Sequence, residues 1–264
     1  MIESFVAAAR LPQTGRDHAA AIAKAESQAT LAVLERLGDG DWQRPTGCTE
    51  WDVRALVSHL VAQFEDSVNL RTMLRRRSLG RRRYPDKDTL DAHMAVQVDD
   101  HAGKSGPALV EQFALLWPRA VKARRGTPAL VRWVKVSPGI AGAPRMSLGY
   151  MVDILFTRDL WMHRVDLAQA VGQPLVTGDH DRHIVEQIVR DLALGWDSAP
   201  IALELTGAAG GCWLLGSGDP VATVRADAVA YMRALSGRDD NVAVELVSGD
   251  ASGLAAARAA RVIF

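Results

Sequence analysis

The chain has 264 residues, of which 48% are hydrophobic and 23% are charged, and its formal net charge is zero. This is the composition of an ordinary globular protein, and the length suits one large domain or two modest ones. A neutral chain has no general attraction to nucleic acid or to an anionic membrane, so we expect neither as a partner.

The two cysteines, Cys48 and Cys212, lie far apart and form no CxxC pair. This argues against a disulfide framework and against a cysteine-rich zinc site. The first 20 residues lack the apolar segment of a signal peptide, and no apolar run approaches the roughly 20 residues that cross a bilayer. We therefore expect a soluble protein of the cytoplasm.

Four long helical regions with irregular joints are predicted in the first two thirds of the chain. Local signals mark their ends, such as Asp52 as an N-cap and Gly38 as a helix stop. Four such helices favour a helical bundle. The predicted regions are residues 16–37, 52–75, 88–123 with an interruption at 103–107, and 147–172.

The pattern changes after Gly172, where short β-like runs separated by glycine-rich turns favour a meander. The boundary is expected between residues 173 and 178. The expected fold class is α+β, with a four-helix bundle in residues 1–172 and a small α/β domain in residues 180–264. The predicted elements of the second part are helices 180–195, 226–235 and 251–260 and strands 201–206, 212–215, 221–225 and 242–247.

Three ionisable residues fall on the buried stripe of the fourth helix, where burial is costly unless they are paired or bind a metal. They are Asp159, His163 and Asp166. Asp159 and His163 lie one helical turn apart on one face, so both can ligate one ion, and both suit zinc. The alternative is a hydrogen-bonded Asp–His pair that only stabilises the bundle. Thr157, Arg158 and Arg164 are expected outside the stripe.

A third ligand has to come from another helix, and His59 is the candidate. It lies on the flank of the apolar stripe of the second helix, near Leu56 and Gln63. A residue on the flank can face a cavity between helices. The alternative is a surface or partly buried histidine without a ligand role.

Two segments resemble a known family. Residues 45–60, PTGCTEWDVRALVSHL, resemble the pattern P-T-x-C-x-x-W-x-V-x-x-L-x-x-H-L, and the segment from Arg158 to Gly172 resembles R-x-E-x-x-x-H-x-x-D-x-x-x-A-x-G. Both patterns are typical of the mycothiol-dependent maleylpyruvate isomerase family, a branch of the DinB-like metalloproteins. The C-terminal region, with Val224–Asp227 and Leu235–Arg238, is similar to the small sterol-carrier-like domain of that family.

The resemblance implies one divalent metal, usually zinc, held by His59, Asp159 and His163. The family pattern has Glu where this chain has Asp159, so metal binding is either kept with a different geometry or weakened. Asp166 is expected to orient an imidazole or to replace Asp159 as ligand. Three protein ligands leave one coordination position open, as catalytic zinc sites do.

The resemblance also implies mycothiol as the thiol cofactor and a small electrophilic molecule as substrate. Addition of the thiolate followed by elimination gives an isomerase, and addition alone gives an S-transferase. Arg238 is a candidate to hold a substrate carboxylate, against the alternative that it only follows a helix cap at Gly237. The competing function is a catalytically silent binding or regulatory protein that has lost the metal. A homodimer is among the oligomeric states left open.

Three further features are assigned ordinary structural roles. The basic segments at residues 75–77 and 81–83 are expected to be a solvated helix end and loop. His93 and His101 are separated by eight residues in polar surroundings, so we expect an exposed helix there. Cys48 is expected to pack in the loop before the second helix.

Overall fold

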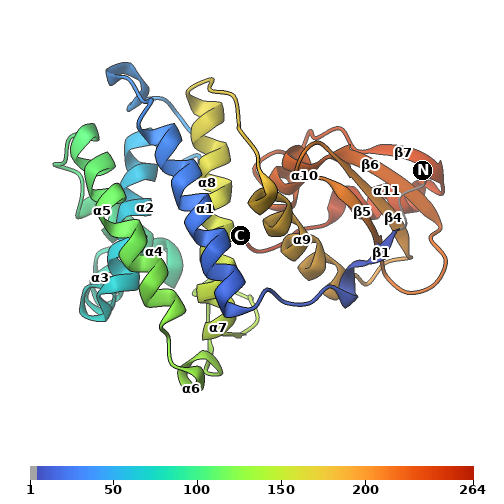
Figure 1. The fold of residues 1–264 in the computed structure, drawn as a ribbon, viewed down its shortest axis with the longest axis horizontal. Helices are drawn as coiled ribbons and strands as arrows, with labels where there is room; N and C mark the ends of the chain where they lie inside the picture. Colours follow the sequence, from blue (N-terminus) through green and yellow to red (C-terminus); the bar gives the residue numbers. More distant parts are fainter. Residues whose placement is uncertain (1–4) are drawn as a thin grey trace. The chain divides into compact units, whose positions relative to one another are not determined.

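A computed structural model describes residues 5–264, which form two compact units (Figure 1). One unit is Gly15–Leu175. The other combines Val176–Phe264 with the chain before Gly15. No helix in residues 5–264 is both long enough and apolar enough to span a membrane.

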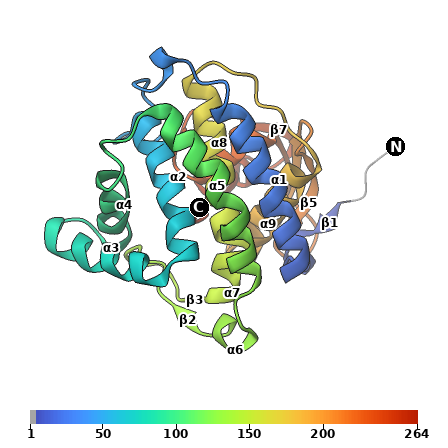
Figure 2. The same ribbon diagram turned by 60° about the vertical axis from the view of Figure 1, so that its left-hand side comes forward.

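The first unit is a bundle of four long helices, seen side by side in Figures 1 and 2. They are α1 (Arg16–Leu34), α2 (Val53–Val68), α5 (Gly106–Arg125) and α8 (Phe156–Ala170). Helix α2 packs along α5, and α1 lies against both α5 and α8. A cluster of apolar side chains fills the core between α2 and α5, with the rings of Phe64 and Phe113 5.0 Å apart.

Shorter elements surround the bundle. Helices α3 and α4 pack on each other and on α2, and a two-stranded antiparallel ribbon precedes α8. A short helix and a π-helical turn lead directly into α8. These elements are α3 (Leu70–Arg83), α4 (Thr89–Asp99), α6 (Ala129–Arg132), β2 (Lys135–Val136), β3 (Met146–Ser147), α7 (Leu148–Tyr150), the π turn (Met151–Leu155) and a 3-10 turn (Asp39–Asp41).

The helix predicted over residues 52–75 is two helices, because Asn69 interrupts it. Asn69 has an extended backbone, and its side chain accepts hydrogen bonds from the backbone N–H groups of Arg71 and Thr72. Asparagine is a strong N-cap, so a new helix starts there. Helix α3 then continues to Arg83, through residues predicted to be a loop.

Helix α8 is buried more completely than its amphipathic pattern predicts. Thr157, Arg158 and Arg164 were expected outside the buried stripe, yet each is no more than 2% exposed. For Arg164 the reason is a bidentate ion pair, in which Nε and Nη2 donate to the two carboxylate oxygens of Glu26 on α1 at 2.8 and 3.0 Å. A paired guanidinium can occupy a position that an unpaired one cannot.

The second unit is a five-stranded sheet in the order β1-β5-β4-β6-β7, packed with helices α9, α10 and α11. Strand β4 lies in the centre of the sheet, and all of its side chains except the last, Thr206, are buried or half-buried. The elements are β1 (Val6–Ala7), a 3-10 turn (Ala8–Arg10), α9 (Asp179–Leu194), β4 (Ile201–Thr206), β5 (Gly211–Leu215), β6 (Ala222–Asp227), α10 (Ala228–Leu235), β7 (Glu245–Gly249) and α11 (Ala251–Ala259).

Two sequence predictions fail in this sheet. The expected meander would pair β6 with β5, but β6 runs parallel to β4 on its other side. The free edge of β5 is instead occupied by β1, which pairs with it in parallel. Residues 5–14 therefore belong with the sheet, although they were predicted within a bundle of residues 1–172.

Candidate metal centre

The structure brings His59, Asp159 and His163 together between α2 and α8. Nε2 of His163 lies 3.3 Å from Oδ1 of Asp159, and Nε2 of His59 lies 3.6 Å from Oδ2. The three ligand atoms lie within 4.8 Å of one another. His59 and His163 are each 3% exposed, so both histidines are shielded from water, whereas the Asp159 side chain is 22% exposed.

Local structure explains how the two helices present these side chains. Asp52 caps α2 by accepting a hydrogen bond from the backbone N–H of Ala55 at 2.8 Å, which sets the start of the helix that carries His59. Asp159 and His163 occupy positions i and i+4 of α8. The ring of Trp51 lies 5.0 Å from the ring of His59 and 6.1 Å from that of His163, so it packs on both.

One buried atom makes a metal a good fit. Nε2 of His59 is buried and has no hydrogen-bond partner, although it lies near Asp159. A buried nitrogen without a partner is costly unless something else binds it. Two imidazole nitrogens and one carboxylate oxygen are a normal donor set for a divalent transition metal. The residues present therefore fit one such ion.

The charges of the group reinforce one another. Burial by itself raises the pKa of Asp159, but the charge and hydrogen bond of His163, with His59 close by, outweigh burial and hold this pKa well below its usual value. Burial by itself lowers the pKa of His163. Asp159, Asp166 and Cys48 together outweigh it and raise the His163 pKa well above its usual value.

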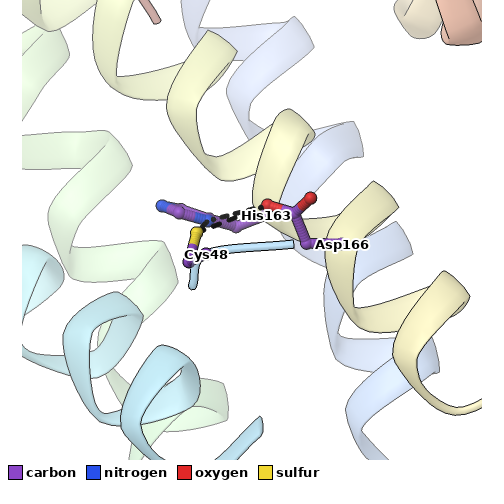
Figure 3. Close-up of side chains that lie close together, drawn as sticks. All are labelled: Cys48, His163 and Asp166. Carbon is purple, nitrogen blue, oxygen red and sulfur yellow. Dashed lines mark hydrogen bonds and ion pairs between the residues drawn. The ribbon is translucent and has the colours of Figure 1, made fainter. Parts of the chain in front are cut away.

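Asp166 lies on the opposite side of the His163 ring from Asp159. Its Oδ2 is 3.4 Å from Nδ1 of His163, and the residue is fully buried. Cys48 completes a second cluster, with Sγ 3.8 Å from the same Nδ1 and 3.7 Å from Asp166 Oδ2 (Figure 3). These three also have the spacing of metal ligands, so His163 is shared between two alternative donor sets.

Sequence reasoning missed Gln63 as part of the group. Its Nε2 donates to Oδ2 of Asp159 at 2.6 Å, and its Oε1 accepts from Nη2 of Arg124 at 3.2 Å. Gln63 follows His59 by four residues and therefore lies on the same face of α2. That spacing was the signal in the sequence that could have identified Gln63. From α2, the Gln63 side chain orients the carboxylate of Asp159 on α8.

A buried polar network behind His59 overturns two expectations. His101 is 1% exposed and Gln97, between the two histidines, is 3% exposed, so their segment is not the exposed helix predicted. Arg76 of the basic segment is 2% exposed rather than solvated. It contacts three carboxylates and a backbone carbonyl. A charged residue is predicted to face solvent because burying an unpaired charge is costly, and its partners on neighbouring helices cannot be identified from the sequence.

Arg238 belongs to the sheet unit, whereas the three candidate ligands belong to the bundle. It follows Gly237, whose φ of 76° is the left-handed value that ends α10, and its backbone N–H donates to the carbonyl of Arg233 at 3.0 Å. This is the cap position predicted for Arg238 as the alternative to a substrate role. Its substrate role stays a prediction.

Comparison with known proteins identifies the family and the fold. The family model described as the mycothiol maleylpyruvate isomerase N-terminal domain matches residues 23–168. A crystal structure of the mycothiol-dependent maleylpyruvate isomerase shares 15% identity with this chain, with a TM-score of 0.59, and the match covers 93% of this chain and 97% of that one. A mutant of that isomerase matches equally well, at 14% identity. No curated protein gives a significant match.

The structural matches show the fold: a helical N-terminal domain and a small sheet-containing C-terminal domain, as predicted. The family model covers more than half of the chain, from within α1 to the last turn of α8. It includes the segments of His59 and His163 on which the sequence resemblance depends. The chain therefore belongs to the mycothiol maleylpyruvate isomerase family of enzymes, the family that its sequence predicted.

Proposed function

We propose that this protein is a metal-dependent enzyme that uses mycothiol to isomerise, or to conjugate with the thiol, a small electrophilic molecule. The observation that carries the proposal is the meeting of two imidazole Nε2 atoms and one carboxylate in a family of thiol-dependent isomerases. His59, Asp159 and His163 would hold one divalent ion, with zinc the best match to this donor set. A bound ion of this kind lowers the pKa of a nearby thiol.

The residues of the chain have definable tasks in this function. His59 and His163 present Nε2, and Asp159 supplies the negative charge between them. Asp166 accepts from Nδ1 of His163 and thereby holds that ring in place. Gln63 holds the Asp159 carboxylate by a hydrogen bond of 2.6 Å.

The external thiolate is proposed to add to one carbon of an electron-poor C=C bond, so that a C–S bond forms while the π bond breaks and its electron pair moves onto the group that activates it. The carbon–carbon bond is then single and can rotate. Return of the electron pair re-forms the C=C bond, breaks the C–S bond, releases the thiolate and yields an isomer. Protonation of the adduct instead retains the C–S bond, yields a thioether and makes the protein a transferase. Arg238 is proposed to bind a substrate carboxylate, and the reaction is proposed to occur in the cytoplasm.

The silent-protein alternative depends on Asp159 replacing the family's Glu. Against it, the shorter side chain still reaches both imidazoles, with oxygens 3.3 and 3.6 Å from their Nε2 atoms. A carboxylate that had lost its role would have no reason to be held between two buried histidines and Gln63. The geometry therefore favours retention of metal binding.

The test is turnover of the full chain with and without mycothiol, with maleylpyruvate as the first substrate and a panel of small electrophiles after it. We expect conversion only with thiol, about one divalent metal per chain, and loss of both metal and conversion in His163→Ala. His183→Ala, which changes a histidine with a 41% exposed side chain, serves as the matched control. Full conversion without thiol, or unchanged metal content in both His59→Ala and His163→Ala, would contradict the proposal.

A further inference from the structure

The ring of His59 has a second nitrogen, Nδ1, that faces away from Asp159 and His163 and toward α4. Nδ1 lies 2.8 Å from Oε1 of Gln97, while Nε2 faces Asp159. We propose that Gln97 and Asp66 are positioning residues that hold His59 in the tautomer with its hydrogen on Nδ1. The lone pair of Nε2 then points toward Asp159. The use of that lone pair for a metal rests on the proposed function.

Asp66 is a hydrogen-bond acceptor because of its neighbours. Arg76 donates from Nη1 to Asp66 Oδ1 at 2.7 Å, and both side chains are largely buried. The guanidinium favours the ionised carboxylate, which has no hydrogen to donate. Oδ2 of Asp66 therefore requires donors, and two nitrogens lie near it: Nε2 of Gln97 at 2.6 Å and Nε2 of His93 at 2.8 Å.

This requirement sets the direction of the Gln97 amide. With NH2 toward Asp66, the amide donates to the carboxylate and directs Oε1 at His59. With the amide reversed, two acceptor oxygens would meet at 2.6 Å, and the repulsion would be strong in a site with little water. The charge of Asp66 thus fixes which end of Gln97 faces the histidine.

The direction of Gln97 then fixes the histidine. Oε1 is an acceptor, so the atom facing it at 2.8 Å has to carry a hydrogen. A neutral imidazole has one such hydrogen, and placing it on Nδ1 leaves Nε2 as a lone pair. His59 and Gln97 are each 3% exposed, so the protein decides the arrangement. The absence of a hydrogen-bond partner at Nε2 agrees with this assignment.

The tautomer can be measured directly in the metal-free full chain by 15N chemical shifts of the histidine rings. Wild-type His59 is expected to show a protonated Nδ1 and an unprotonated Nε2. Gln97→Met keeps the length of the side chain and removes both hydrogen bonds, and Asp66→Asn removes the charge that orients the amide. Both variants are expected to lose the strict Nδ1–H preference.

The same variants are then titrated with zinc in competition with a chelator. We expect the affinity to fall about 10- to 100-fold, the usual effect of removing a residue that orients a metal-bound histidine. Gln187→Met is the matched control, since Gln187 is a buried glutamine on α9 that hydrogen-bonds Thr14 and Pro12 and belongs to the sheet unit. Circular dichroism reports whether each variant is folded.

A wild-type protein with the hydrogen on Nε2 of His59 would overturn the inference, whatever the variants do. Unchanged tautomer and zinc affinity in folded Gln97→Met and Asp66→Asn would also overturn it. The expected tautomer in a wild-type protein that binds no zinc would support the positioning role and contradict the proposed metal function. The two proposals can therefore fail separately.

Discussion

The two histidines of the candidate metal centre have their outer nitrogens satisfied in different ways. Nδ1 of His163 faces the carboxylate of Asp166, three residues further along the same helix. Nδ1 of His59 faces the neutral amide of Gln97 on α4, and that amide depends on Asp66 and Arg76. The first arrangement is local to one helix, whereas the second needs α2, α3 and α4 to pack correctly.

The difference also changes how robust the two sides are. The partner of His163 carries its own charge and can accept a hydrogen in any direction that its oxygens face. The partner of His59 is an amide that would fit its site in two directions without the charge of Asp66. We therefore expect the orientation of the His163 ring to depend on one residue, Asp166. The orientation of the His59 ring should depend on residues several contacts away.

The largest effect is expected from Asp166→Ala, which tests the local side. Loss of the carboxylate leaves a buried ring nitrogen without its acceptor, so the free energy of unfolding of the metal-free protein should fall by about 1–3 kcal/mol. Zinc affinity should fall about 10- to 100-fold. Urea unfolding and chelator competition measure the two quantities.

Asp17→Ala is the control for this variant, because Asp17 is a surface carboxylate whose pair with Arg125 is exposed. It should leave the free energy of unfolding indistinguishable from that of wild type, because an ion pair in water is screened. Asp166→Asn should recover part of the zinc affinity, since its amide oxygen can still accept. If Asp166→Ala equalled wild type in both measurements, the contrast between the two histidines would be lost.

A smaller effect is expected from Glu65→Gln, which tests the distant side through pH. Burial raises the pKa of Glu65, but hydrogen bonds and charges of His101 and Arg76 outweigh it and lower the pKa from 4.5 to about 2. The ionised carboxylate therefore stabilises the fold above pH 4.5, and this contribution is lost as the pH falls toward 2.

Wild type should exceed Glu65→Gln in free energy of unfolding by on the order of 1–2 kcal/mol at pH 7, allowing for screening of a partly exposed pair. The difference should shrink steadily between pH 5 and pH 3 in urea unfolding. A difference that stays constant across that range would show that the ionisation of Glu65 does not support the Arg76 network.

The smallest effect is expected from Cys48→Ala. The thiol lies 3.8 Å from Nδ1 of His163 and 3.7 Å from Asp166, on the side of the ring away from Asp159. If Asp159 and the two Nε2 atoms hold the metal, zinc content and thiol-dependent turnover should stay within about twofold of wild type. The double variant Cys48→Ala/Cys212→Ala should behave in the same way. Loss of stoichiometric zinc in Cys48→Ala would instead place the ion in the Cys48–His163–Asp166 cluster.

Several features could be predicted because they are periodic or local. Asp159, His163 and Asp166 share one face of a helix whatever surrounds it, and the residues around His59 carry a recognisable pattern. Helix starts at Asp52 and the change of character after Gly172 are likewise properties of short segments. These signals were enough for the family, for the fold class and for naming the residues that meet between α2 and α8.

Other features depend on residues that are distant in sequence, and only the tertiary structure decided them. Arg76 is buried because Glu65, Asp66 and Asp100 come to it from neighbouring segments, and Gln97 reaches His59 across 38 positions. Strand β1 takes the edge of β5 although about 200 residues separate them. A charged residue or a strand edge has the same local sequence pattern whether it is exposed to water or paired with another part of the chain. The sequence by itself therefore determined which groups were present. Tertiary packing decided which of them became buried and paired.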